Sequence, residues 1–501
     1  MLDTVSMRLV PRALAAACAL ALILAATALG DTGYPNKLTN DYPQASYPGE
    51  QHLHFKFGPI HVNPGQNTVS ISPIKADGLP SEPGYITSFK PNLTYLDGTV
   101  PGVDVVHMHH AVWLVDGAPE MAMGEEKTIV NLPQGFGGRY HPGQNWNMVH
   151  MIHDLLPNPT DVYVTYDMTF VPDSDPASAQ IKPTHVLWMD VAGFRAYPVF
   201  DARTSYGHKG RYTFPNMART ARERTAIGPA HQYVVPHDMT LVYTAGHVHP
   251  GGLWTDLTAT RNGKTVRLFR SIAHYYEPAG AVSWDVSMTA TPPDWRVQLK
   301  AGDVLNVSGT YDTKRASWYE VMAIMPTAVY DGNDAGGVDP FVTQPTQKGI
   351  LTHGRLPENS VHGGKRSGLP NARDMLNGRP VEGPIQIQNF LYGRGDLNAG
   401  GRIPTVKRGH ALTFLNKDDA KTIWHTITAC KAPCNKSTGI AYPTANGKVD
   451  FDSGELGTGP VGFWPVSGRT TWSTPKNLKT GTYTYFCRIH PFMRGAFRVT
   501  R

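Results

Sequence analysis

Four side chains near the C-terminal end have the types and the spacing to bind a soft metal ion. Cys487, His490 and Met493 follow one another with two residues between each. A thiolate, an imidazole and a thioether together suit copper better than any hard cation. A second imidazole usually comes from an earlier strand, and His425 fits because it lies in a β-branched and aromatic run at residues 422–428. The sequence therefore predicts a copper site.

The spacing of these residues resembles that of cupredoxins, and the short Cys-x-x-His-x-x-Met loop is most similar to that of amicyanin. The resemblance covers roughly the last quarter of the chain. It implies a Greek-key β-sandwich with a type 1 copper, in which Cys487, His425 and His490 form a trigonal plane and Met493 is a weak axial ligand. The alternative is a buried free cysteine beside a core methionine.

The cysteines support this site from an independent direction. Cys430 and Cys434 bracket three residues and are close enough in sequence for a small-loop disulfide. Removal of Cys18 with an N-terminal signal then leaves Cys487 unpaired in an oxidising compartment, where metal ligation would protect it from oxidation. A disulfide that includes Cys487 stays open as the rival pairing, and it would abolish the site.

The N-terminus predicts export. Arg8 and Arg12 precede an apolar run at residues 13–29, and Gly30 ends a group of small residues suited to cleavage. We expect residues 1–30 to be a signal peptide and the mature protein to be secreted or periplasmic. A transmembrane anchor is the alternative, but the run is short and polar residues follow at once. No later segment is apolar enough to span a bilayer, so we expect no stable membrane insertion after signal removal.

Histidines also gather in the first half of the chain. His107, His109 and His110 lie in one strand-like run, and three histidines so close together are hard to explain as core residues. In a regular strand His107 and His109 share a face, whereas His109 and His110 point apart unless a β-bulge turns one of them. Whether His107 or His110 joins His109 as a ligand is therefore open. A further run supplies His150 and His153.

A second pair, His247 and His249, ends a strand-like run at residues 241–249. Spacing two on a strand presents both rings to one side, as a two-point metal clamp requires. An exposed strand-end pair is the alternative. Met322, in the apolar run 318–325, is the nearest candidate for a third ligand, although a core position is the commoner fate of such a methionine.

The order of these motifs resembles the copper type II ascorbate-dependent monooxygenases, the peptidylglycine hydroxylase group. The stretch 247–252 and the phrases at 57–59 and 64–66 are also similar to the stress-up-regulated Nod19 family. Together the two resemblances cover roughly residues 50–330. This region has no cysteine, whereas the monooxygenases are cross-linked by disulfides. The first resemblance implies two β-sandwiches, with one copper held by His109, His110 and His153 and another held by His247, His249 and a methionine.

Length and composition bound the architecture. A chain of 501 residues is too long for one core. Its 17% of charged residues and its 50 glycines and 41 prolines are typical of a turn-rich β protein. We therefore expect an all-β chain with four parts after the signal. They are two tandem β-sandwiches at 49–195 and 196–340, a linker or arm at 341–384, and a cupredoxin Greek-key β-sandwich at 385–501.

The function predicted from these patterns is that of an exported copper redox protein. In the enzymatic form it is a copper-dependent monooxygenase or oxidase of a small organic substrate, with a fused blue-copper electron-transfer domain. The alternative is a non-enzymatic copper-binding or electron-transfer protein whose front domains dock a redox partner. The net charge of +6 includes no run of five like charges, which argues against nucleic-acid binding.

Overall fold

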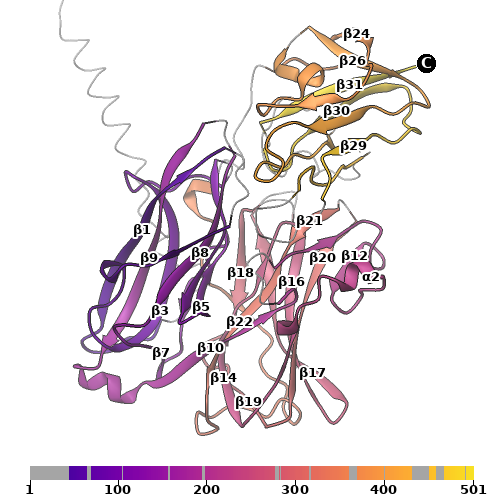
Figure 1. Cartoon of the computed structure of the whole chain (residues 1–501). Helices are drawn as coiled ribbons and strands as arrows, with labels where there is room; N and C mark the ends of the chain where they lie inside the picture. The colour runs from indigo at the N-terminus through magenta and orange to yellow at the C-terminus, as the bar shows by residue number, and fades with distance from the viewer. Residues whose placement is uncertain are drawn as a thin grey trace, which may run out of the picture.

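The structure, a computed structural model, describes most of the chain after residue 43 (Figure 1). The described ranges are 44–64, 69–103, 105–155, 158–193, 198–276, 281, 284–314, 317–359, 369–399, 401–430, 451–458, 468–490 and 492–501. The predicted signal peptide and Cys434 lie outside them.

The fold class predicted from the sequence is confirmed, because the described residues are almost all strands and turns packed as sandwiches of sheets. The α-helix of the described ranges is a single turn, α2 (Ala221–Arg224), and the other helical segments are short 3-10 turns. No described helix has the length and apolar character needed to cross a bilayer.

The first sandwich packs a four-stranded sheet against one end of a ten-stranded sheet. Its core lies between the two layers and is centred on the rings of Phe89, Trp113 and Tyr166, all within 6 Å of one another. The small sheet has the order β2 (Ser70–Pro73), β8 (Trp146–Asp154), β4 (Val106–Val115) and β5 (Ala118–Met123). The facing strands are β1 (Gln51–Val62), β9 (Thr160–Pro172), β3 (Gly84–Tyr95) and β7 (Phe136–Tyr140), with β6 (Val130–Asn131) paired to β3.

The ten-stranded sheet continues into the second sandwich. β10 (Lys182–Asp190) pairs in parallel with β7 and, on its other edge, antiparallel with β22 (Ala323–Tyr330). The sheet goes on through β14 (Met239–Thr244) and β19 (Val297–Leu299), and β15 (His247–Val248) pairs with β22. The shared sheet thus carries β15 with His247, whereas β4 and β8, which carry the earlier histidines, lie in the four-stranded sheet packed against it.

A seven-stranded sheet closes the second sandwich over a core that includes Leu241, Leu257 and Met325. Its path is β12 (Arg211–Phe214), β20 (Val304–Asp312), β16 (Gly252–Arg261), β17 (Lys264–Tyr275), β18 (Val286–Ala290) and β23 (Ile350–Leu351), with β13 (Gln232–Val234) paired to β20. A separate two-stranded sheet joins β11 (Phe200–Ala202) to β21 (Trp318–Val321).

The segment predicted as a linker or arm packs in part against the front half, residues 49–340. Its strand β23 pairs with β18, and the buried His353 ring lies against the backbone carbonyl of Glu126. The buried ammonium of Lys127 lies 3.5 Å from Glu358 of the same segment. These contacts tie the chain to the front half before it enters the last sandwich.

The C-terminal sandwich is built of a five-stranded and a three-stranded sheet. In Figure 1 it stands in orange and yellow beside β21 of the second sandwich. The first sheet has the order β24 (Leu376–Pro380), β26 (Arg402–Lys407), β31 (Arg494–Thr500), β30 (Gly481–Phe486) and β28 (Thr428–Cys430). The second has the order β25 (Ile385–Ile387), β27 (Thr413–Asn416) and β29 (Thr471–Ser473).

Replacing Trp113 by alanine tests the first core. The ring is fully buried, so we expect a loss of about 3–5 kcal/mol in the free energy of unfolding, because a large core cavity is left behind. Urea unfolding followed by circular dichroism measures it. Ile71→Ala is the control, since Ile71 is 63% exposed and its loss should cost less than about 0.5 kcal/mol. Equal costs for the two changes would contradict the description of this core.

Candidate metal centres

Three donor atoms converge in the C-terminal sandwich. The ligand atoms of His425, Cys487 and His490 all lie within 4.8 Å of one another, and all three residues are buried. The two Nδ1 atoms are 3.2 Å apart, and Cys487 Sγ lies 3.6 Å from Nδ1 of His490. Within the described residues this is the one group of three histidine, cysteine or acidic side chains that meets so closely. One thiolate and two imidazoles fit a borderline or soft metal ion such as copper or zinc.

The loop between β30 and β31 positions these atoms through backbone hydrogen bonds. The N–H groups of Thr426 and His490 each donate to Cys487 Sγ at 3.3 Å. The Met493 N–H donates to the His490 carbonyl at 2.9 Å, and the Cys487 N–H donates to the Met493 carbonyl at 3.3 Å. The loop is therefore closed on itself, with Met493 buried beside Cys487 in the core.

A carboxylate and an aromatic ring fix the histidines. His425 Nε2 donates to Asp418 Oδ2 at 2.8 Å, which turns its Nδ1 toward the other donor atoms. Asp418 in turn accepts from the backbone N–H of Asn389 at 2.7 Å. The ring of Phe390 stands edge-on to His490 and His425, with centroids 5.2 and 5.8 Å away. Such partners orient metal-binding imidazoles and set their tautomer.

The electrostatics favour a thiolate. Burial raises the pKa of the Cys487 thiol, but the neighbouring His490 and His425 outweigh burial and hold that pKa well below its ordinary value. Burial lowers the pKa of His425, and its hydrogen bonds to Asp418 and Cys487 more than reverse this, so that the pKa is raised. A thiolate is the form that binds metal.

Cys430 does not compete for this site, because it is part of a disulfide. Cys487 is a free, buried cysteine.

The front histidines meet at the seam between the two front sandwiches. We call His107, His109, His110, His153, His247 and His249 the front histidine cluster. The register of β4 against β8 shifts between Met108 and His110, so the strand carries a β-bulge at His109. From the sequence alone, whether His107 or His110 joins His109 as a ligand depended on the presence of such a bulge. The His109 ring lies 4.7 Å from His153, 4.5 Å from His249 and 5.5 Å from His110, measured between centroids.

Two further side chains, Trp284 and Met151, contact the front histidine cluster, and neither was singled out from the sequence. Trp284 stacks on His107 at 5.0 Å between centroids and lies 4.8 Å from His249. Met151 places its Sδ 3.1 Å from His109 Nδ1. Met151 stands two residues before His153 on β8, a same-face spacing that could have indicated it, whereas nothing in the sequence around Trp284 did so.

The pair at the second sandwich is oriented as a metal ligand pair would be. His249 Nδ1 donates to the Glu320 carbonyl at 2.7 Å, and His247 Nδ1 donates to Glu126 Oε1 at 3.0 Å. In both rings the Nε2 atom is buried and has no hydrogen-bond partner among the described residues. Met322 packs into a core cluster with residues such as Met151 and Ile324.

Burial favours the neutral form of five rings of the cluster. It lowers the pKa of His107 and of His110 to about 3. The pKa values of His109, His153 and His249 also lie well below the ordinary value, first because of burial and then because the rings repel one another's charge. Neutral imidazole is the form that binds metal, so these five rings are in the ligating form at neutral pH.

A cavity of about 110 Å³ lies between the front half and the C-terminal sandwich. His490 is close enough to help lower the pKa of His153, so the two candidate centres approach each other across this junction. The front half lines the cavity with residues that include His107, His109, His153, His249 and Trp284. The C-terminal sandwich contributes Thr426, Glu455, Arg488 and Ile489.

Comparisons with known proteins add little. No protein-family model matches the chain, and a search among curated proteins finds no match. Among solved structures, the chain is similar to a copper-containing nitrite reductase from Thermus scotoductus at 12% identity and a TM-score of 0.14, over 54% of this chain and 59% of that one. The chain thus spans less than two thirds of that protein's length. The infectious bursal disease virus VP2 subviral particle shows 9% identity and a TM-score of 0.18, over 64% and 81%. Scores this low carry no argument.

Replacing Asp418 by asparagine tests the first centre. We expect metal affinity to fall by roughly 10–100-fold, the usual effect of losing a carboxylate that orients a ligating histidine. Competition against a chelator of known affinity measures it. The matched control is Asp374→Asn, which removes an exposed carboxylate of the same part of the chain and should leave the affinity unchanged. Unchanged affinity in the Asp418 variant would remove His425 from the ligand set.

Proposed function

We propose that the protein is an exported copper redox protein whose C-terminal sandwich is a cupredoxin-type electron-transfer domain. The observation that carries this proposal is the convergence of one buried thiolate and two imidazoles on a hydrogen-bonded loop that also holds Met493. Copper held by these residues would pass single electrons by alternating between Cu(I) and Cu(II). Backbone donors to the sulfur and the Asp418 contact fix the donor atoms, which favours little rearrangement on electron transfer.

The front histidine cluster is the proposed second centre. The buried Nε2 atoms of His247 and His249, which have no hydrogen-bond partner among the described residues, suit a metal ligand set better than a packed core, because an unpartnered buried polar atom costs stability. We propose that it serves a copper-dependent monooxygenase or oxidase acting on a small organic substrate. Such chemistry consumes electrons, and the junction cavity beside the cluster borders the loop of the first centre.

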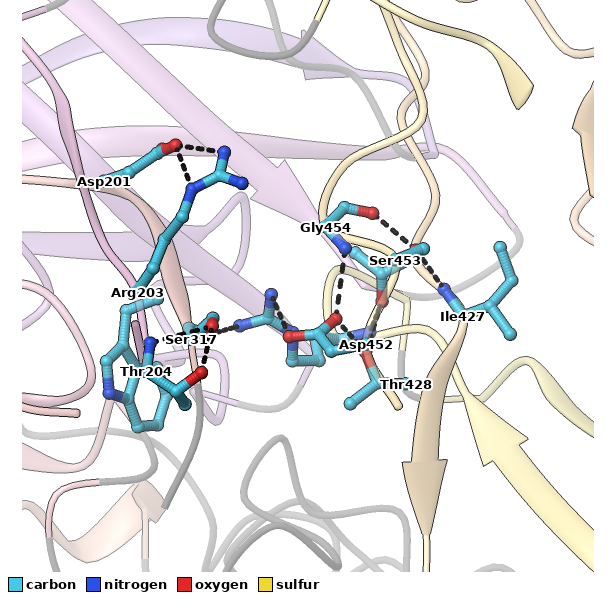
Figure 2. A network of polar contacts seen from close by, with 12 residues as sticks. Asp201, Arg203, Thr204, Ser317, Ile427, Thr428, Asp452, Ser453 and Gly454 are labelled. Atoms are coloured by element: carbon cyan, nitrogen blue, oxygen red, sulfur yellow. Dashed lines mark hydrogen bonds and ion pairs between the residues drawn. The ribbon is translucent and has the colours of Figure 1, made fainter. Parts of the chain in front are cut away.

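Arg488 supports the proposal that the two centres work together. It directly follows Cys487, and its Nη1 donates across the junction to the Ser317 carbonyl at 3.0 Å. Its guanidinium pairs with Asp452 at 3.2 Å and stacks over the Tyr319 ring at 5.1 Å. Figure 2 shows this network, with Asp201, Arg203 and Ser317 of the front half on one side and Asp452 to Gly454 on the other. The metal loop is thus anchored to the front half.

The alternative function is a non-enzymatic electron-transfer protein whose front domains dock a redox partner. One observation favours it. Within the described residues, no three donor atoms of the front histidine cluster lie within 4.8 Å of one another, as those of the first centre do.

Replacing Cys487 by serine tests the blue-copper assignment. We expect the intense visible absorption of a copper-thiolate bond to vanish, because the hydroxyl of serine does not supply that ligand. Optical spectra of the copper-loaded protein measure the change, and spin-resonance spectra report any copper bound by imidazole alone. Colour that persists in the variant would refute the assignment.

Replacing His109 by alanine tests the front centre and separates the two functions. We expect copper content to fall to one ion per chain while the visible band stays unchanged, since His109 contacts rings of both front sandwiches. His410→Ala, at an exposed histidine, is the control. A single copper per chain already in the unaltered protein, with no oxygen consumed after reduction, would support the non-enzymatic alternative instead.

A further inference from the structure

A second cavity, of about 90 Å³, lies within the front half at the seam of the two sandwiches. Its walls come from β5 on one side and from β10, β14 and β22 of the shared sheet on the other. Most of them are apolar, with residues that include Met121, Val130, Leu132, Val186, Ala245 and Ala328. An apolar cavity of roughly 150 Å³ accepts benzene, so this one accepts a somewhat smaller hydrocarbon group.

Two carboxyl groups line this otherwise apolar space. Glu126 is 4% exposed, and while its Oε1 accepts from His247, its Oε2 is buried and has no hydrogen-bond partner among the described residues. Glu120 stands on β5, and burial raises the pKa of its carboxyl to about 7. The unpartnered Oε2 of Glu126 is costly in an apolar space and the half-buried Glu120 lies on the same cavity, so both groups gain from a ligand that carries hydrogen-bond donors and positive charge.

The geometry argues against a bare metal ion as that ligand. Within the described residues, Glu120, Glu126 and His247 do not bring their donor atoms within 4.8 Å of one another. A primary ammonium group has three N–H donors and can serve acceptors that are set farther apart. An anion is disfavoured, because it would meet the two carboxylates at short range.

We infer that this cavity binds a small primary aliphatic amine as its ammonium ion, with the hydrocarbon part against the apolar walls and the nitrogen toward Glu126 and Glu120. The bound amine would lie beside His247, whose ring contacts His249 of the front histidine cluster at 5.2 Å between centroids. Binding itself requires no copper, so the inference stands apart from the proposed function. If both hold, aliphatic amines are a substrate class.

Calorimetric titration of the full chain tests this inference, both as purified and after removal of metal with a chelator. The probes are n-butylammonium, n-butanol and n-butyrate, which share one hydrocarbon chain and differ in charge. We expect n-butylammonium to bind in both preparations and at least about tenfold more tightly than n-butanol, the effect of one charge-assisted hydrogen bond. We expect n-butyrate not to bind. Equal binding of n-butanol, or binding of n-butyrate, would overturn the inference.

Variants locate the binding site. Glu120→Gln and Glu126→Gln should each weaken n-butylammonium binding by about tenfold or more, because each removes one anionic acceptor. Glu382→Gln makes the same change of charge at an exposed site outside the cavity and should have no effect. Ala122→Leu keeps both carboxyls and fills the cavity, so it should also weaken binding. If Glu120→Gln and Ala122→Leu fold and bind as the unaltered protein does, the ligand lies elsewhere and the inference fails. Binding that needs copper would equally overturn it.

Discussion

One sulfur atom held between two imidazole rings is the interaction on which the C-terminal sandwich depends. A thiolate buried from water is unstable on its own, because burial favours the neutral thiol. Here the two backbone N–H groups of Thr426 and His490 and the two rings stabilise it. The same hydrogen bonds close the loop that carries Met493. Ligand geometry and loop conformation therefore stabilise each other.

In the front half, the buried histidines meet at the seam of two sandwiches rather than on one loop. The ten-stranded sheet runs through both front sandwiches, so strands that are far apart in the sequence meet at one seam. The bulge at His109 lets one strand contact the other sandwich through His249 while His107 and His153 still face each other. On the other side of His247 lies the apolar cavity with its two carboxyls. The pair His247 and His249 thus borders two spaces, the apolar cavity at His247 and the histidine-lined junction cavity at His249.

The sequence was informative where the pattern is local. The low share of charged residues and the many glycines and prolines predicted the all-β fold. The spacing of Cys487, His490 and Met493 with the run around His425 indicated residues that the structure brings together or buries side by side. It could not show that β7 and β10 join two sandwiches in one sheet, because pairing of distant strands depends on packing of the whole chain. For the same reason it gave no sign of Trp284 against the histidines or of the junction cavity. The sequence also did not show whether β4 carries a bulge at His109, because this depends on the register of β4 against β8.

The position of Arg488 links the charge at the first centre to the attachment of the domains. Its guanidinium interacts electrostatically with Cys487 and, largely covered, contacts Ser317 and Tyr319 of the front half. A buried positive charge favours whichever state of a neighbouring metal site carries less positive charge, and exposure to water screens that effect. If the first centre holds copper as proposed, docking would favour its reduced state through the part of this charge that Asp452 and Glu455 leave uncompensated. By thermodynamic reciprocity reduction would tighten docking, and the chain would hold its domains together most firmly when it has an electron to deliver.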